Sequence, residues 1–422
     1  MPQPLPDYDH DLLIGRQPII NAQQELVGYA LSFRECGSDG GGADGAPECA
    51  MSATAGVVCA AFAELGLGDA LGPQQAFIRA DEDFIGDDVV EFLPAGQVVL
   101  ELDFRLPVSP ERVARCAQLR ERGYRLALAR YDGSDPAVAT LLPLIDIVKI
   151  DTQANSGQLA GLVTPLIGRP LQLLADRVDT REAMERCRDL GFALFQGYYF
   201  ARPQIVSGRR LSSSQLTLIR LINLVAREAD SFEIEENFKR EPALTVNLLR
   251  LVNAVGFGVV QKVDSLRHAL NILGRKQLLR WLQLLLMASS GNSAQPERDP
   301  LLQIAAQRGR LMENLADRCR PDRHGIGDEA FLAGIMSLMP AALGLPIKEI
   351  LDQIPVADSL QQALAAREGE LGRLLALTEH LDDNDWGGCD SLLATLPALS
   401  PAVVSNSLSE ALAWLHRNDD PA

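Results

Sequence analysis

The sequence predicts a (β/α)8-type barrel with an antiparallel first strand, followed by an α-helical domain, and three observations lead to this prediction. The first two hundred residues of the 422-residue chain contain eight short runs of β-strand character. From the third run onward, segments of helical period fall between the runs, which implies parallel crossover connections. After Pro203 the strand pattern stops, and residues 212 to about 415 have the apolar spacing of successive helices.

Eight strands in this alternation fit a closed barrel better than an open sheet. The first two strands have only the turn NAQQE (21–25) between them, so they should pair antiparallel. The predicted strands are DLLIGRQPII (11–20), LVGYALSF (26–33), QAFIR (75–79), VVLEL (98–102), YRLALA (124–129), DIVKI (146–150), LQLLA (171–175) and FALFQ (192–196).

Capping residues mark where two crossover helices begin and end. Ser109 is the expected N-cap of one helix, with Pro110 at its first position and Gly123 at its end. Thr180 and Gly191 limit a second helix in the same way.

We expect two domains, a barrel over residues 10–205 and a helical domain over residues 206–415. Within the helical domain, Ser265 is the expected N-cap of the segment LRHALNIL, which lies ahead of Gly274. The run HLDDND (380–385) lacks the longer alternation of oxygen ligands that a Ca²⁺ loop needs, so we interpret it as a solvated turn.

Composition limits the partners and the compartment. The net charge of -17 and the pI near 4.8 disfavour binding to nucleic acid or to an anionic membrane. The seven cysteines show no CxxC pair or metal-ligand spacing, and their odd number argues against a full disulfide framework, so we expect reduced thiols. The N-terminus lacks the features of a signal peptide, and the apolar run at 281–290 is too short to span a bilayer. We therefore expect a cytoplasmic protein without membrane insertion.

Catalytic groups in such barrels lie at the C-terminal ends of the strands. These ends carry Ala30 to Arg34, Arg79, Glu101, Ala129 with Arg130, Lys149 with Asp151, Asp176 and Gln196. In chain order, the motifs RQPII, GYALSFR, FIR, VVLELD, YRLALARYDGS, DIVKID, LLADRVDT and FQGYYFARP resemble the EAL domain, over about residues 10–205. Members of that family are barrel phosphodiesterases that hydrolyse a phosphodiester bond of the second messenger cyclic di-GMP and so open its ring. The resemblance implies hydrolysis by a metal-activated water, with two divalent ions held by carboxylates and an Asn.

The chain departs from this pattern at the implied metal ligands. Ala30 stands where the family has the glutamate that names it, and Arg79 stands where it has a metal-binding Asn. Ala129 and Arg130 replace its paired aspartates. We therefore expect a degenerate domain that is not an enzyme, with no catalytic residue, no bound metal and no cofactor.

Other family positions are retained. Gln17, Arg34, Lys149 and Gln196 match positions that handle the nucleotide or line the site, and Arg34 is suited to a bidentate phosphate contact. Glu101 is kept, and Asp176 stands in place of a longer Glu. The predicted set of vestigial or ligand-binding residues is Gln17, Arg34, Glu101, Lys149, Asp176 and Gln196.

The second half resembles the HDOD domain, a helical relative of the HD metal hydrolases, over about residues 205–415. The motifs LLRLVN, SLRHALNILG and FLAGIMSLM carry this resemblance. Ser337 and Leu338 stand where catalytic relatives have the His-Asp pair, so metal binding is not expected here.

Both resemblances together indicate an EAL-HDOD protein of bacterial signalling. The first hypothesis is a non-catalytic regulator or scaffold that binds protein partners, chiefly through the helical domain. The second is a receptor that binds cyclic di-GMP in the degenerate pocket without hydrolysis. A homodimer is left open.

Overall fold

The chain forms two compact units in the computed structural model. The first unit joins the described residues up to Phe200 to Leu377–His416, and the second contains the described residues from Ala201 to Ala376. Residues 377–416 therefore pack with the barrel, and the predicted domain bounds, 10–205 and 206–415, stay predictions. The structure describes residues 11–36, 55–103, 108–201, 211–239, 242–253, 263, 265–289, 299–354 and 356–416.

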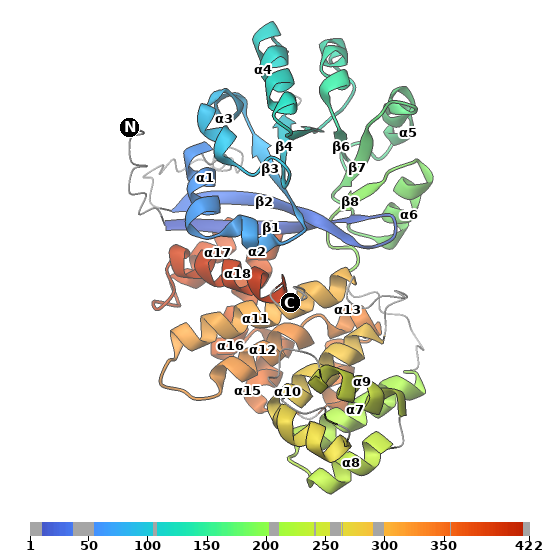
Figure 1. Cartoon of the computed structure of the whole chain (residues 1–422), viewed down its shortest axis with the longest axis vertical. Helices are drawn as coiled ribbons and strands as arrows, with labels where there is room; N and C mark the ends of the chain where they lie inside the picture. Colours follow the sequence, from blue (N-terminus) through green and yellow to red (C-terminus); the bar gives the residue numbers. More distant parts are fainter. Residues whose placement is uncertain are drawn as a thin grey trace. The chain divides into compact units, whose positions relative to one another are not determined.

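Eight strands close the barrel in sequence order, as predicted (Figure 1). β1 pairs antiparallel with both β2 and β8, and every other neighbouring pair is parallel. The predicted antiparallel start is thus confirmed. The strands are β1 (Asp11–Asn21), β2 (Leu26–Cys36), β3 (Gln75–Ala80), β4 (Val98–Asp103), β5 (Arg125–Ala129), β6 (Ile147–Asp151), β7 (Gln172–Asp176) and β8 (Leu194–Gln196).

The predicted caps of the crossover helices are confirmed. The hydroxyls of Ser109 and Thr180 accept hydrogen bonds from the backbone N–H of the third residue of α4 and α6, Arg112 and Ala183. Gly123 and Gly191 follow these helices with φ of 93° and 94°, which glycine adopts without a steric penalty. The helices are α1 (Ala55–Glu64), α2 (Leu67–Leu71), α3 (Glu82–Gly86), α4 (Pro110–Glu121), α5 (Leu159–Val163) and α6 (Arg181–Asp189).

One crossover differs from a regular helix. Between β5 and β6 the chain forms two short 3-10 helices, Pro136–Thr140 and Leu142–Leu144. A proline at the start of each sets φ for the turn and interrupts regular hydrogen bonding.

A ring of buried side chains fills the barrel interior. Its members come from seven of the eight strands and are Ile19, Phe77, Val99, Ala127, Ile147, Leu174 and Leu194, with Val27 and Ala30 of β2 packed against them. Side chains alternate between the two faces of a strand, so the residue two positions further along points inward as well. The residues two positions after the ring residues therefore form the next layer of inward-pointing side chains.

The C-terminal segment, which we define as residues 377–416, packs on β1 and β2. It contains the end of α16 (Gly369–Asp383), α17 (Trp386–Leu393) and α18 (Pro401–His416). Ser405 Oγ donates to the backbone oxygen of Leu12, and Ser409 Oγ donates to that of Leu65. Arg16 Nε lies 3.6 Å from a carboxylate oxygen of Asp382, with both side chains buried.

The second unit is all helical in its described ranges, as predicted. Ser265 caps α10 through the His268 N–H, and Gly274 interrupts the helical dihedrals inside α10 with φ of 69°. The helices are α7 (Ser213–Ala226), α8 (Ser231–Lys239), α9 (Pro242–Asn253), α10 (Leu266–Ala288), α11 (Pro300–Cys319), α12 (Ile326–Met336), α13 (Met339–Leu343), α14 (Ile347–Gln353), α15 (Asp358–Ala366) and the first part of α16.

Two glycines allow α11 and α12 to touch. A Cβ added to Gly334 would lie 2.6 Å from Gly309 Cα, so Gly334→Ala must push the helices apart. We expect a loss of about 1–3 kcal/mol in the free energy of unfolding, measured by urea denaturation. Gly161→Ala in α5 is the control, because a Cβ there meets no atom within 4 Å. Equal stability of the two variants would contradict the close packing.

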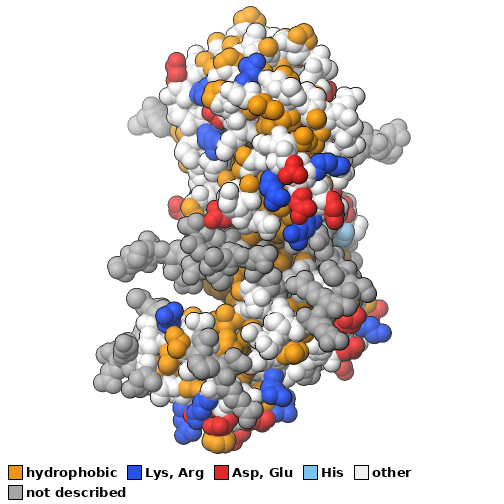
Figure 2. Space-filling model, turned by 90° about the vertical axis from the view of Figure 1, so that its right-hand side faces the viewer, with side chains coloured by type: hydrophobic (Ala, Val, Ile, Leu, Met, Phe, Trp, Pro, Cys, Tyr) orange, Lys and Arg blue, Asp and Glu red, His pale blue; other side chains and the backbone are white. Residues whose placement is uncertain are grey.

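Charged side chains of both signs occur on the surface of the described residues. Figure 2 shows Lys and Arg side chains interspersed with Asp and Glu on one face of the described residues. The stretch Ile326–Leu343 is long and apolar enough to cross a membrane by length and composition, yet 72% of it is buried in the fold. The expectations of no nucleic-acid partner, no membrane insertion and a cytoplasmic location stay predictions.

Candidate functional site

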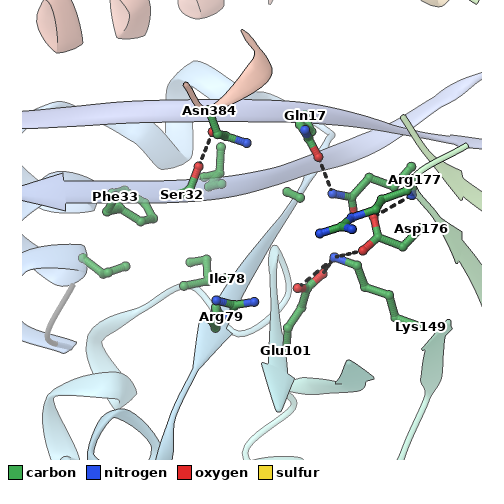
Figure 3. Close-up of a pocket in the computed structure, with 14 residues that line it drawn as sticks. Gln17, Ser32, Phe33, Ile78, Arg79, Glu101, Lys149, Asp176, Arg177 and Asn384 are labelled. Carbon is green, nitrogen blue, oxygen red and sulfur yellow. Dashed lines mark hydrogen bonds and ion pairs between the residues drawn. The ribbon is translucent and has the colours of Figure 1, made fainter. Parts of the chain in front are cut away.

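A pocket lies at the C-terminal ends of the parallel strands. Arg79, Glu101 and Lys149 point into it because each lies two positions after a ring residue of its own strand (Figure 3). The cavity measures about 240 Å³. It is lined by Gln17, Ala30, Leu31, Ser32, Phe33, Val58, Ile78, Arg79, Glu101, Lys149, Asp176, Arg177, Gln196 and Asn384.

A buried lysine joins two carboxylates at the floor of the pocket. Lys149 Nζ donates to both oxygens of Glu101, at 2.9 and 3.1 Å, and lies 4.0 Å from Asp176 Oδ2. Burial alone would lower the pKa of Lys149, but the carboxylates of Asp176 and Glu101 raise it above its usual value. Burial raises the pKa of Asp176, and the nearby ammonium only partly offsets this. Lys149 is therefore held in its charged form.

Arg79 is a half-buried cation of the pocket. Its guanidinium forms no hydrogen bond or ion pair with the rest of the described chain, and Figure 3 shows it directed across the cavity. The lining contains three cations (Arg79, Lys149, Arg177) and two carboxylates (Glu101, Asp176), a local charge of 3 − 2 = +1. A positive cavity in a chain of net charge -17 favours an anionic ligand.

Two glutamines, from β1 and β8, also line the cavity. Gln196 Nε2 donates to Gln17 Oε1 at 2.7 Å. Gln196 Oε1 is buried and has no hydrogen-bond partner among the described residues. A buried unpaired acceptor costs free energy unless a ligand or water donates to it. This oxygen can accept from an N–H group of a bound ligand.

The side chains present do not fit the two-metal centre that the resemblance implies. In the described ranges, no group of three His, Cys, Asp or Glu residues could hold a metal ion. Both oxygens of Glu101 are taken by Lys149, and Ala30 and Arg79 line the pocket without offering a metal ligand. A guanidinium beside the site also repels a cation.

The structure brings five of the six predicted site residues to this pocket: Gln17, Glu101, Lys149, Asp176 and Gln196. Arg34 is placed elsewhere, because its guanidinium binds Asp390 and the backbone oxygen of Trp386. Arg130 lies outside the lining as well, 3.4 Å from Asp103 Oδ2, with φ of 57°. The functional roles of the six residues stay predictions.

Two polar lining residues were missed from the sequence, Arg177 and Asn384. Arg177 directly follows the strand-end residue Asp176, so its position was the available signal. Asn384 belongs to the run interpreted as a solvated turn. The structure places that run beside the barrel, where His380 Nδ1 lies 2.8 Å from Asp385 Oδ2.

The positions of the missing His-Asp pair are filled by other contacts. Ser337 Oγ accepts from Arg308 Nη1 at 2.9 Å and donates to the Gly334 oxygen. Leu338 is buried in the helical core. Ser337, bonded to the buried Arg308, and the buried Leu338 thus fill the positions of the His-Asp pair.

Comparisons with known proteins agree with this two-part architecture. The model of the HDOD domain matches residues 211–343. Cyclic di-GMP phosphodiesterase CdgJ of Vibrio cholerae is 31% identical over 98% of this chain and 94% of its own length. The uncharacterized protein YuxH of Bacillus subtilis is 27% identical over 96% of this chain and 98% of its own. The solved EAL-domain protein YkuI of Bacillus subtilis, in complex with cyclic di-GMP and calcium, has a TM-score of 0.36 at 18% identity, covering 62% of this chain and 72% of that one.

These matches define a class of protein in which an EAL-type barrel is joined to an HDOD domain. The chain belongs to the EAL-HDOD family.

The prediction that the chain is not an enzyme is wrong. Its relative CdgJ, similar over nearly the whole chain, is named a cyclic di-GMP phosphodiesterase. The prediction depended on single positions of the metal site, whereas the similarity extends over both domains. The label of a degenerate domain has no support from the comparison.

Proposed function

We propose that the pocket at the end of the barrel binds cyclic di-GMP. The relative CdgJ is named for this molecule, and the pocket carries the charge that the molecule requires. The observation that supports the proposal most directly is the unpaired guanidinium of Arg79, directed into a cavity with Lys149 at its floor. A phosphodiester anion is the natural partner of such a group.

The rest of the lining suits a guanine nucleotide. The unpaired oxygen of Gln196 can accept from the N–H edge of guanine. Apolar side chains of Leu31, Phe33 and Ile78 offer contact area for a base or ribose. The cavity of about 240 Å³ is smaller than the roughly 300–1,000 Å³ of drug-sized sites, so part of the ligand lies in the open mouth.

Equilibrium dialysis of the full chain with labelled cyclic di-GMP tests the proposal. We expect saturable binding that weakens as salt rises, because the contact is between charges. Chromatography of the same samples shows whether any cyclic di-GMP has been hydrolysed to the linear dinucleotide. Cyclic di-AMP is the matched competitor, since it keeps both phosphates and changes the bases. No binding of cyclic di-GMP at high micromolar concentration would contradict the proposal.

Removing one carboxylate should tighten binding. Asp176→Asn keeps the size of the side chain and deletes a negative charge that faces the anionic ligand. We expect an affinity gain of about 3- to 10-fold, roughly 0.6–1.4 kcal/mol. Asp179→Asn, three positions later and outside the pocket lining, is the control in the dialysis assay. Weaker binding in Asp176→Asn would show that the carboxylate itself contacts the ligand.

The expected role of the helical unit in binding a protein partner stays a prediction, as does a homodimer. Two large apolar side chains on its first helices are exposed, Leu216 on α7 and Phe232 on α8. They are the positions at which such a contact would be looked for first.

A further inference from the structure

The barrel pocket is not built from the barrel alone. Asn384 is one of its lining residues, although it lies between α16 and α17, far along the chain from every barrel strand. Its φ is 56°, in the left-handed region that Asn tolerates better than most residues. The tight turn between the two helices therefore presents an amide side chain to the cavity.

The two ends of this amide have different environments. Ser32 Oγ donates to Asn384 Oδ1, which fixes the side chain from β2. Asn384 Nδ2 has no hydrogen-bond partner in the described part of the chain, and Figure 3 shows this nitrogen turned away from Ser32, toward the cavity. An amide N–H held in this way is a donor available to a ligand oxygen.

Further contacts hold the turn against the strands. Arg34 Nη2 lies 2.7 Å from Asp390 Oδ2, and Arg34 Nη1 donates to the Trp386 oxygen at 3.1 Å. Gly15 on β1 makes room for the turn, because a Cβ there would overlap Asn384 Oδ1 and come within 2.8 Å of the Trp386 ring. Arg34 thus connects β2 to α17, within the C-terminal segment.

We propose that Asn384 is a ligand-binding residue of the barrel pocket, donating from Nδ2 to a phosphate or ribose oxygen, and that Arg34 is a positioning residue which acts through Asp390. This rests on the proposed binding of cyclic di-GMP. The C-terminal segment is then one wall of the site. A cyclic di-GMP site in this chain requires residues 377–416 as well as the barrel strands.

Two substitutions at Asn384 test the contact. Asn384→Gly keeps the left-handed backbone and deletes the donor, and we expect about a 10-fold weaker Kd in dialysis with cyclic di-GMP. Asn384→Asp keeps the shape, replaces the donor by a negative charge, and should weaken binding further. Asn406→Asp makes the same charge change at an exposed position of α18 and should leave the Kd unchanged.

The outcomes separate this inference from the proposed function. If the unaltered chain does not bind cyclic di-GMP, the proposed function fails. If it binds and both Asn384 variants bind equally well, the contact is overturned while the function stands. Tighter binding in Asn384→Gly would overturn it too, since the turn would then obstruct the pocket.

A charge swap tests the role of Arg34. Arg34→Asp and Asp390→Arg should each weaken binding by breaking the same ion pair, and the double variant should recover most of the affinity. An Arg34 that touched phosphate directly would not be replaced by an arginine on α17. Failure of the double variant to recover, with a melting temperature equal to that of the unaltered chain, would overturn the positioning role.

Discussion

Arg79→Glu, which reverses the charge, is expected to weaken cyclic di-GMP binding on the order of 100-fold or more. The change removes a charge-assisted hydrogen bond and places a third carboxylate beside Glu101 and Asp176. Arg79→Ala removes the contact without the repulsion and should cost about 10-fold. Calorimetric titration of the full chain gives both values.

The control for this series is Arg188→Glu. Arg188 is exposed on α6 and does not line the pocket, so it reports the general effect of lowering the net charge by two units. If Arg188→Glu weakens binding as much as Arg79→Glu does, the pocket does not hold the anion. A salt dependence that is lower in Arg79→Ala than in the unaltered chain would support the direct contact.

Lys149→Met is expected to destabilise the barrel unit by about 3–5 kcal/mol. The substitution leaves the carboxylate of Glu101, which is only 6% exposed, without its partner. Removing one member of a buried pair costs more than removing both, because an isolated buried charge is poorly solvated. Urea denaturation followed by circular dichroism measures the loss.

A second variant separates lost charge from lost packing. Glu101→Gln in the Lys149→Met background removes the isolated charge and should recover a large part of the stability. Lys348→Met, at an exposed position of α14, is the control for the substitution itself. A double variant less stable than Lys149→Met would show that the ion pair is not the cause.

Local sequence patterns were sufficient for the barrel. Each predicted strand was found, because alternation and strand length are properties of a few adjacent residues. The caps at Ser109, Thr180 and Ser265 were found for the same reason, since a cap involves only the next three positions.

Contacts between distant segments were not accessible in this way. An amphipathic pattern shows that α18 has an apolar face but does not say that the face covers β1. The bond of Ser32 to Asn384 and the ion pair of Arg34 with Asp390 each join residues more than 350 positions apart. A strand-end arginine that suits phosphate recognition suits a carboxylate equally well.

A crystal structure of the full chain with cyclic di-GMP tests the central claim most directly. The proposal predicts the ligand at the C-terminal ends of the barrel strands, with a phosphate oxygen at a hydrogen-bond distance of about 2.7–3.2 Å from the Arg79 guanidinium. It also predicts a ligand oxygen within the same distance of Asn384 Nδ2. A ligand bound outside this pocket, or inside it with both groups unused, would contradict the proposal.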